Sequence, residues 1–160
     1  MKIITKSILI LSLLLILTIS CGFKVLDKSN TNNFTIKEIN ANGNNRINYK
    51  IKNYLLSNTQ KNNTNVLTIN IKTKIKKEIQ EKNIKNEITK YKINLKANGN
   101  NYFIKKNRKN DFSLSVVGSY SVNTKNYSNT INNEKNLINN LTEKLAKNIL
   151  KEINKTINDF

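Results

Sequence analysis

The side chain best suited to covalent chemistry in this sequence is the thiol of Cys21, which is the only cysteine among 160 residues. Cys21 follows an apolar run over residues 8–19, and Lys2 and Lys6 precede that run. A basic start, a short apolar segment and a small residue before the cleavage point, here Ser20, are typical of a secretory signal peptide. The run is too short to cross a bilayer comfortably, because a spanning helix needs about 20 apolar residues.

Cys21 stands where the acceptor cysteine of a bacterial lipobox would stand. A thiol can accept a diacylglycerol group as a thioether, and cleavage before it would free an amine for a further acyl chain. Several acyl chains anchor a protein stably, because each buried methylene contributes about 0.8 kcal/mol. Thr18 departs from the pattern, since leucine is usual there, and Gly22 favours sorting to the outer membrane. We expect residues 1–20 to be a lipoprotein signal peptide and Cys21 to be acylated; an idle cysteine in a signal anchor is the alternative.

Few other residues could support catalysis or metal binding. Histidine is absent, which removes the usual general base, the usual metal ligand and any Ser-His-Asp triad. The acidic residues are scattered among lysines, and the four glycines are isolated, so no phosphate-binding loop is present. A single cysteine excludes a disulfide within the chain and a cysteine metal site. We therefore expect a protein that is not an enzyme and that holds no cofactor or metal.

The formal net charge of +18 favours a polyanionic partner, such as anionic lipid headgroups, a phosphorylated glycolipid or nucleic acid. Base composition competes as an explanation, because codons for Lys, Asn and Ile can be written entirely in A and T. Nucleic acid is not expected as the partner, since secretion would remove most of it from reach. The tyrosines that could stack on bases are also spread along the chain.

The elements that must position these charges follow from the spacing of apolar residues. Residues 21–33 are expected to comprise the acylated cysteine and a polar tether, and residues 34–160 a single domain. Alternation of apolar and polar residues predicts strands, and recurrence at helical spacing predicts helices. The expected strands cover residues 34–39, 67–79, 88–97 and 112–122, and the expected helices cover residues 46–56 and 131–157.

Several details of these elements can be predicted as well. A change of phase in the third strand predicts a bulge near Thr89 and Lys90. The segment "ANGNN" at residues 97–101 predicts a turn or a strand interruption, and Thr130 or Ser128 is the expected N-cap of the last helix. In the second strand, the residues expected to face the core are Leu67, Ile69, Ile71, Ile75 and Ile79.

The order strand, helix, three strands, helix predicts an α+β two-layer sandwich. Its sheet is expected to be mixed, mostly antiparallel and four-stranded, because the three consecutive strands can pair through short turns. Two helices would cover the apolar face of this sheet. The opposite face would be polar and lined by lysines, and so open to water or to a partner.

With these elements in place, the chain resembles the LPS-assembly lipoprotein LptE family. The resemblance rests on Cys21-Gly22-Phe23 with Leu26 nearby, the short first strand, the helix "RINYKIKNYL" and the three long strands. It ends in "YSNTINNEKNLINNLTEKLAKNIL" and so covers essentially the whole mature chain, with the order and spacing of elements carrying most of it. The chain departs from the family in having no proline and far more Lys and Asn.

The resemblance implies an outer-membrane lipoprotein that faces the periplasm, plugs the LptD β-barrel, assists that barrel's assembly and binds lipopolysaccharide. Family members place basic ligand contacts near the turn between the second and third strands and in the loop before the last helix. Here the candidates are Lys82, Lys85 and Lys125, for which ordinary solvated lysines are the alternative. The alternative function is that of a periplasmic lipoprotein whose basic domain binds either another polyanion or an envelope assembly factor.

Overall fold

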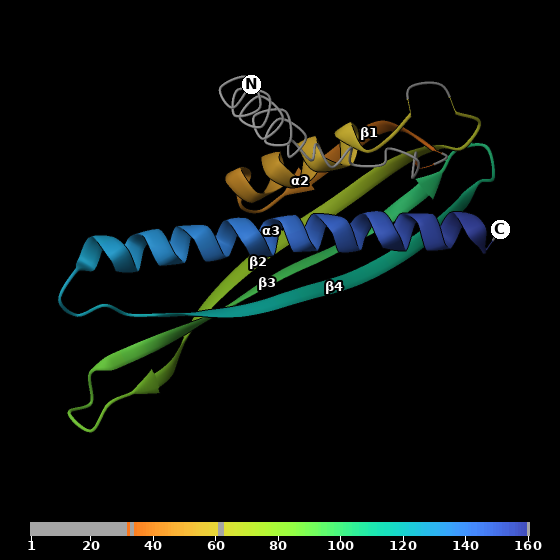
Figure 1. Ribbon diagram of the computed structural model, residues 1–160. Helices are drawn as coiled ribbons and strands as arrows, with labels where there is room; N and C mark the ends of the chain where they lie inside the picture. Colours follow the sequence, from red (N-terminus) through yellow and green to blue (C-terminus); the bar gives the residue numbers. More distant parts are fainter. Residues whose placement is uncertain (1–31, 33, 61–62, 160) are drawn as a thin grey trace, which may run out of the picture. The chain divides into compact units, whose positions relative to one another are not determined.

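The computed structural model describes residue 32, residues 34–60 and residues 63–159. The expected signal peptide, the expected acylation site Cys21 and most of the expected tether lie outside the described residues. The described chain forms, in order, β1 (Thr35–Asn42), α2 (Asn45–Ser57), β2 (Val66–Lys82), β3 (Ile88–Phe103), β4 (Arg108–Ser121) and α3 (Tyr127–Asn158). One sheet packs against two helices, so the predicted α+β two-layer sandwich is confirmed (Figure 1). No helix in this part of the chain is long and apolar enough to cross a membrane.

The sheet has the strand order β1-β2-β3-β4, with β1 parallel to β2 and the other two pairs antiparallel. Helix α2 supplies the crossover connection that a parallel pair requires. The predicted mixed, mostly antiparallel sheet is therefore confirmed. The pairing of β1 reaches only from Val66 to Lys72 on β2. Beyond Lys72, β2 continues for ten more residues with β3 as its one neighbouring strand among the described elements.

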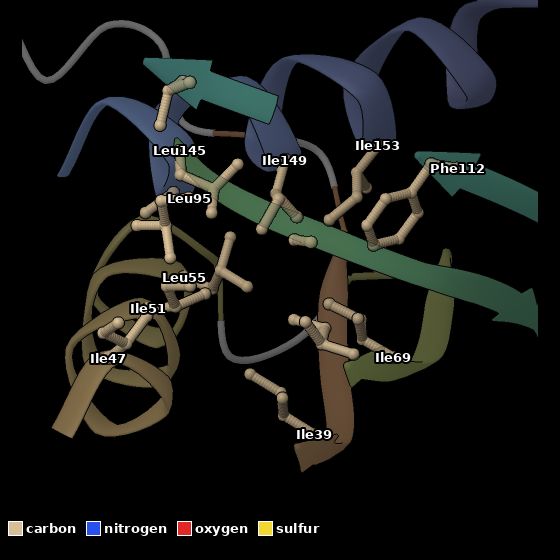
Figure 2. Close-up of a cluster of buried hydrophobic side chains, with 14 of the residues drawn as sticks. Ile39, Ile47, Ile51, Leu55, Ile69, Leu95, Phe112, Leu145, Ile149 and Ile153 are labelled. Atoms are coloured by element: carbon tan, nitrogen blue, oxygen red, sulfur yellow. The ribbon is translucent and has the colours of Figure 1, made fainter. Parts of the chain in front are cut away.

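The core lies between the sheet and both helices. Helix α2 contributes Ile47, Ile51 and Leu55, which are spaced four residues apart and are at most 2% exposed. Helix α3 directs a matching stripe onto β3 and β4, with Leu145, Ile149 and Ile153 pointing toward Leu95 and Phe112 (Figure 2). Full burial of each such side chain contributes about 1.5–3 kcal/mol, so this shared core is what holds the two layers together.

Asparagine caps both helices. The side chain of Asn44 accepts a hydrogen bond from the Ile47 backbone N–H at 3.1 Å, and Asn126 accepts one from Asn129 at 3.2 Å. The prediction of Thr130 or Ser128 as the cap of α3 was wrong. The Thr130 hydroxyl instead accepts a hydrogen bond from the Asn123 backbone N–H at 2.8 Å, because the loop before α3 folds back over the first turn. Asparagine caps as well as serine and better than threonine. With its cap at Asn126, α3 begins at Tyr127, four residues before the expected start at residue 131.

Strand β3 runs without interruption through residues 97–101, so the prediction of a turn or interruption there was wrong. Gly99 pairs with Ile71 on one side and with Phe112 on the other. A Cβ atom at this position would lie 2.9 Å from Cζ of Phe112 and 2.1 Å from the Asn70 carbonyl oxygen. Glycine is here because the neighbouring ring and backbone leave no space for a side chain.

The predicted bulge at the far end of the β2–β3 hairpin is confirmed. Ile79 pairs with Tyr91, Glu81 with Lys90 and Lys82 with Ile88. The register therefore shifts twice, and each strand contains one residue that has no partner in the pairing. One of these two residues is Thr89, which restores the alternation that the phase change disturbs.

The buried face predicted for β2 is correct for its first half and wrong for its second. Leu67, Ile69 and Ile71 are buried, whereas Ile75 is 38% exposed and Ile79 is 52% exposed. The sheet twists, and this end of the hairpin diverges from α3 (Figure 1). The alternation of β2 therefore continues past the point at which the helices cover it.

Candidate functional site

Two of the predicted ligand contacts lie at the tip of the β2–β3 hairpin, Lys82 as the last residue of β2 and Lys85 in the turn that follows it. The Lys82 ammonium donates to Oδ1 of Asn86 at 2.9 Å, and Asn86 has a positive φ of 64°. The Asn83 side chain stabilises the turn by accepting from the backbone N–H groups of Lys85 at 3.0 Å and Glu87 at 2.9 Å. The turn is therefore preorganised, with the Lys85 side chain exposed.

The third predicted contact, Lys125, lies in the loop between β4 and α3. Its backbone N–H donates to Oδ1 of Asn123 at 3.0 Å, and the residue is exposed. Because β4 ends at Ser121, which pairs with Lys90, this loop leaves the sheet at the same end as the β2–β3 turn (Figure 1). The structure thus brings the three lysines to one end of the sandwich. No contact joins Lys125 to Lys82 or Lys85 among the described residues.

The face of the sheet turned away from the helices, which we call the open face, carries lysines as predicted. Lys74 on β2 stands directly opposite Lys96 on β3, and neither has a partner among the described residues. Like charges at directly opposite positions repel, so this pair costs stability. On the same strand Lys76 and Glu78 form an ion pair at 2.5 Å, which raises the pKa of Lys76 and lowers that of Glu78.

A row of asparagines crosses the open face at the other end of the sheet. The amide of Asn40 donates to Asn70 at 3.2 Å, and the amide of Asn70 donates to Asn100 at 3.0 Å. They line a shallow hollow of about 200 Å³, and Asp111 follows on β4 opposite Asn100. Each amide carries donors and an acceptor, so the row suits a polar partner. Sequence reasoning missed it, because it depends on the register of three strands.

The face of the sheet turned toward the helices also holds a charged cluster that sequence reasoning missed. Nζ of Lys77 lies 2.6 Å from Oε2 of Glu134 on α3, and the Tyr120 hydroxyl donates to the same oxygen at 2.5 Å. The ammonium also lies 4.4 Å from the ring centroid of Tyr91 and 5.4 Å from that of Tyr120. The signal that could have revealed it is Lys77, which lies between Ile75 and Ile79 and occupies a position that alternation assigns to the core side of β2.

The pKa values of this cluster favour the charged pair at neutral pH. Partial burial acts to lower the pKa of Lys77, but the hydrogen bonds with Glu134 and Tyr120 outweigh it and raise this pKa. Partial burial acts to raise the pKa of Glu134, and the hydrogen bonds from Lys77 and Tyr120 again outweigh it, so this pKa is lowered. For Tyr120, burial and the bond to Glu134 raise the pKa. The cluster is therefore an ionic link between β2 and α3.

Next to this cluster lies an apolar groove between α2, β2 and the first half of α3. Its volume is about 360 Å³. Arg46 and Lys135 lie at its rim and have no partner among the described residues. The residues that line it are Asn44, Arg46, Ile47, Ile75, Ile131, Glu134, Lys135, Ile138 and Asn139. Within the part of the chain that the structure describes, no three acidic or cysteine residues gather into a metal-binding group. The chemistry that these surfaces offer is recognition through charge, amides and an apolar groove.

No family model matches this sequence, and no curated protein sequence matches it. Among solved structures, the fold is similar to rare lipoprotein B from Shewanella oneidensis, with a TM-score of 0.61 and 10% identity over 76% of this chain and 97% of that one. A lipoprotein B from Nitrosomonas europaea gives a TM-score of 0.64 and 11% identity over 86% and 93%. A minor lipoprotein from Acinetobacter baumannii gives 0.54 and 15% over 78% and 92%. At these identities the likeness establishes the fold, which this chain shares with bacterial lipoproteins.

Proposed function

We propose that this chain is an outer-membrane lipoprotein that faces the periplasm, occupies the lumen of an LptD-like β-barrel and assists that barrel's assembly in lipopolysaccharide transport. The observation that carries the proposal is the fold, which matches 97% of the rare lipoprotein B chain. The sequence adds Cys21 at the end of a short apolar run, which fits acylation and anchoring. The role is structural rather than catalytic.

The open face of the sheet supports the docking part of this proposal. The lumen of a barrel is polar, so a protein that fills it needs side chains that form hydrogen bonds. Across the open face the Asn40–Asn70–Asn100 row supplies amides, and Ser113 and Ser115 of β4 lie on the same face. Such a surface can exchange its hydrogen bonds with water for hydrogen bonds with a lumen wall.

Direct binding of lipopolysaccharide is a further part of the proposal. Its phosphates would meet Lys82, Lys85 and Lys125, which share one end of the sandwich because β4 ends opposite the start of β3. A lysine contacts a phosphate as a point charge, whereas bidentate clamping requires arginine, and the chain has only Arg46 and Arg108. Binding at this end should therefore weaken as the salt concentration rises.

Co-purification from the native envelope tests the proposal. The full-length chain, tagged at its C-terminus, is extracted from membranes in mild detergent, and its companions and its own mass are determined. We expect a large outer-membrane β-barrel to co-purify and Cys21 to carry acyl chains. The Cys21→Ser variant should lose the acyl mass and leave the membrane fraction. Acylated chain recovered without any barrel would refute the docking role while leaving the lipid anchor intact.

A second function is favoured by one observation, the opposed pair Lys74 and Lys96 on the open face, for which the described part of the chain supplies no partner. An anionic partner would relieve their repulsion, as in a periplasmic lipoprotein that binds another polyanion or an acidic assembly factor. The same purification distinguishes the two functions. Recovery of an anionic glycan or lipid in a salt-sensitive manner, without a barrel, would favour the second.

A further inference from the structure

We propose that the free edge of β2, residues 74–82, accepts an extended strand of a partner protein in which apolar and acidic residues alternate. This inference goes beyond the proposed function and does not depend on it, because any envelope protein with such a strand would fit. It rests on three properties of the same nine residues: a backbone edge with which no described strand pairs, a partly exposed apolar face and an excess of positive charge.

The unpaired edge arises because β1 stops early. The last pair between β1 and β2 joins Asn42 to Lys72, and the chain then turns at Gly43 into α2. Gly43 lies against the Thr73 carbonyl, where a Cβ atom would come within 2.2 Å of the oxygen. From Lys74 onward, β2 has β3 on one side and no described strand on the other. The backbone groups on that side can therefore pair with an added strand, which would continue the position of β1.

The apolar face lies on the same segment. Ile75 and Ile79 point to the helix side of the sheet but are 38% and 52% exposed, and Ile131 on α3 is 50% exposed nearby. Alternate side chains of an added strand would lie beside these isoleucines. The groove lined by Ile47, Ile75, Ile131 and Ile138 is continuous with this edge and can receive one of them. Strand addition gains affinity from backbone hydrogen bonds and specificity from such pockets.

The positive charge of this edge favours acidic residues at the positions of the partner strand that alternate with the apolar ones. Residues 74–82 carry four lysines and two glutamates. Lys76 pairs with Glu78, Lys77 with Glu134 and Glu81 with Lys90, so Lys74 and Lys82 are the two lysines of this segment that pair with no carboxylate among the described residues. On the open face an added strand would place its side chains next to Lys74 and Lys76, on the side of the sheet opposite to Ile75 and Ile79. Acidic side chains fit these positions. A second copy of this strand would place lysine opposite lysine, so the edge disfavours pairing with itself and favours an acidic strand.

A peptide of defined sequence tests the inference on the full-length chain, purified in mild detergent. The probe is a fluorescent, end-capped octapeptide of alternating glutamate and valine. One control peptide alternates lysine and valine, and another has four glutamates followed by four valines. We expect the alternating acidic peptide to bind at least about tenfold more tightly than either control, a difference readily measured by fluorescence anisotropy. Bound peptide should slow amide hydrogen exchange in residues 74–82 but not along β4.

Two matched variants locate the binding edge. Ile79→Asp changes an exposed residue on the apolar face of β2, and we expect it to weaken peptide binding by about tenfold or more. Val117→Asp changes a residue of β4 that is 47% exposed, and it should leave binding unchanged. Equal binding of the basic peptide, protection along β4 in place of β2, or absence of binding would each overturn the inference. So would protection of residues 74–82 by self-association of the chain without peptide.

Discussion

Nζ of Lys77 on β2 lies 2.6 Å from Oε2 of Glu134 on α3, and the Tyr120 hydroxyl of β4 donates to that same oxygen at 2.5 Å. The contact joins β2 to the consecutive elements β4 and α3, and Lys77 lies 57 residues before Glu134 in the sequence. Lys77 lies between Ile75 and Ile79, which are 38% and 52% exposed. The contact therefore ties the first half of α3 to the sheet where the isoleucine core thins out.

Replacing Glu134 by glutamine tests how much this contact stabilises the fold. The neutral amide loses the ion pair and weakens the bond from Tyr120, so the free energy of unfolding should fall by about 1 kcal/mol, discounted for partial exposure. Urea unfolding followed by circular dichroism measures this change, and a double-mutant cycle with Lys77→Met isolates the coupling. The matched control is Glu143→Gln, since Glu143 pairs with Lys147 on the exposed side of α3 at 2.9 Å. Equal losses in both variants would show that the cluster has no special role.

The same contact should make stability depend on pH at both extremes. Because the folded pKa of Glu134 is lowered, its stabilisation is complete above the ordinary carboxylate pKa of about 4.3 and is lost as pH falls through the lowered value. The pKa values of Lys77 and Tyr120 are raised, so their contribution is complete below about pH 10 and is lost as pH rises through the raised values. The difference in unfolding free energy between wild type and Glu134→Gln should therefore shrink as the pH falls below about 4.3. A difference that stays constant over this range would contradict the assignment.

Two buried asparagines should respond to substitution in opposite directions. The Asn101 side chain is fully buried, and neither its nitrogen nor its oxygen has a hydrogen-bonding partner among the described residues. Asn101→Val should raise the free energy of unfolding by about 1 kcal/mol, because it removes the desolvation penalty of an unpaired amide. Asn48, by contrast, accepts a hydrogen bond from the Thr73 hydroxyl at 2.7 Å. Asn48→Leu should lower stability, because it leaves the Thr73 hydroxyl with only its longer hydrogen bond to the Asn42 carbonyl oxygen at 3.4 Å. Thermal unfolding compares the two, and destabilisation by Asn101→Val would reveal a partner for that amide.

Two strand glycines should differ in the cost of an added methyl group. At Gly99 a Cβ atom would meet the Asn70 carbonyl oxygen at 2.1 Å, and backbone cannot give way cheaply. Gly99→Ala should therefore lower the free energy of unfolding by about 1–3 kcal/mol. At Gly118 the Cβ atom would meet Cδ1 of Leu137 at 2.7 Å, which is the end of a flexible side chain. Gly118→Ala should cost less, and equal melting temperatures of the two variants would contradict this account.

The repulsion between Lys74 and Lys96 on the open face should lower stability, and reversing one of the two charges should remove this loss. Lys74→Glu turns the repulsion with Lys96 into attraction, which should raise the free energy of unfolding by about 0.5 kcal/mol at low salt. The gain should disappear at high salt, where the charges are screened. Unfolding at low and at high ionic strength measures both effects. Lys85→Glu, in the exposed turn without a directly opposed cation, is the control and should show no such gain.

The sequence by itself determined the elements and the layers of this protein, because apolar spacing records which side of each segment leaves water. The spacing of Ile47, Ile51 and Leu55 predicted α2, and alternation through Leu67, Ile69 and Ile71 predicted β2. Their order predicted an α+β sandwich with a lysine-rich open face. It could not show where the cover of helices ends, so Ile75 and Ile79 were expected in the core.

Only the tertiary structure decided which residues from different elements meet. The Asn40–Asn70–Asn100 row, the Lys77–Glu134 pair and the position of Gly99 beneath Phe112 all depend on strand register. Register is set by the packing of whole faces and by local bulges, and so cannot be read from any one segment. The free edge of β2 has the same origin, because it exists where β1 turns away and β2 does not. Periodicity reports the environment of each residue, whereas a contact between two distant residues depends on the path of the chain between them.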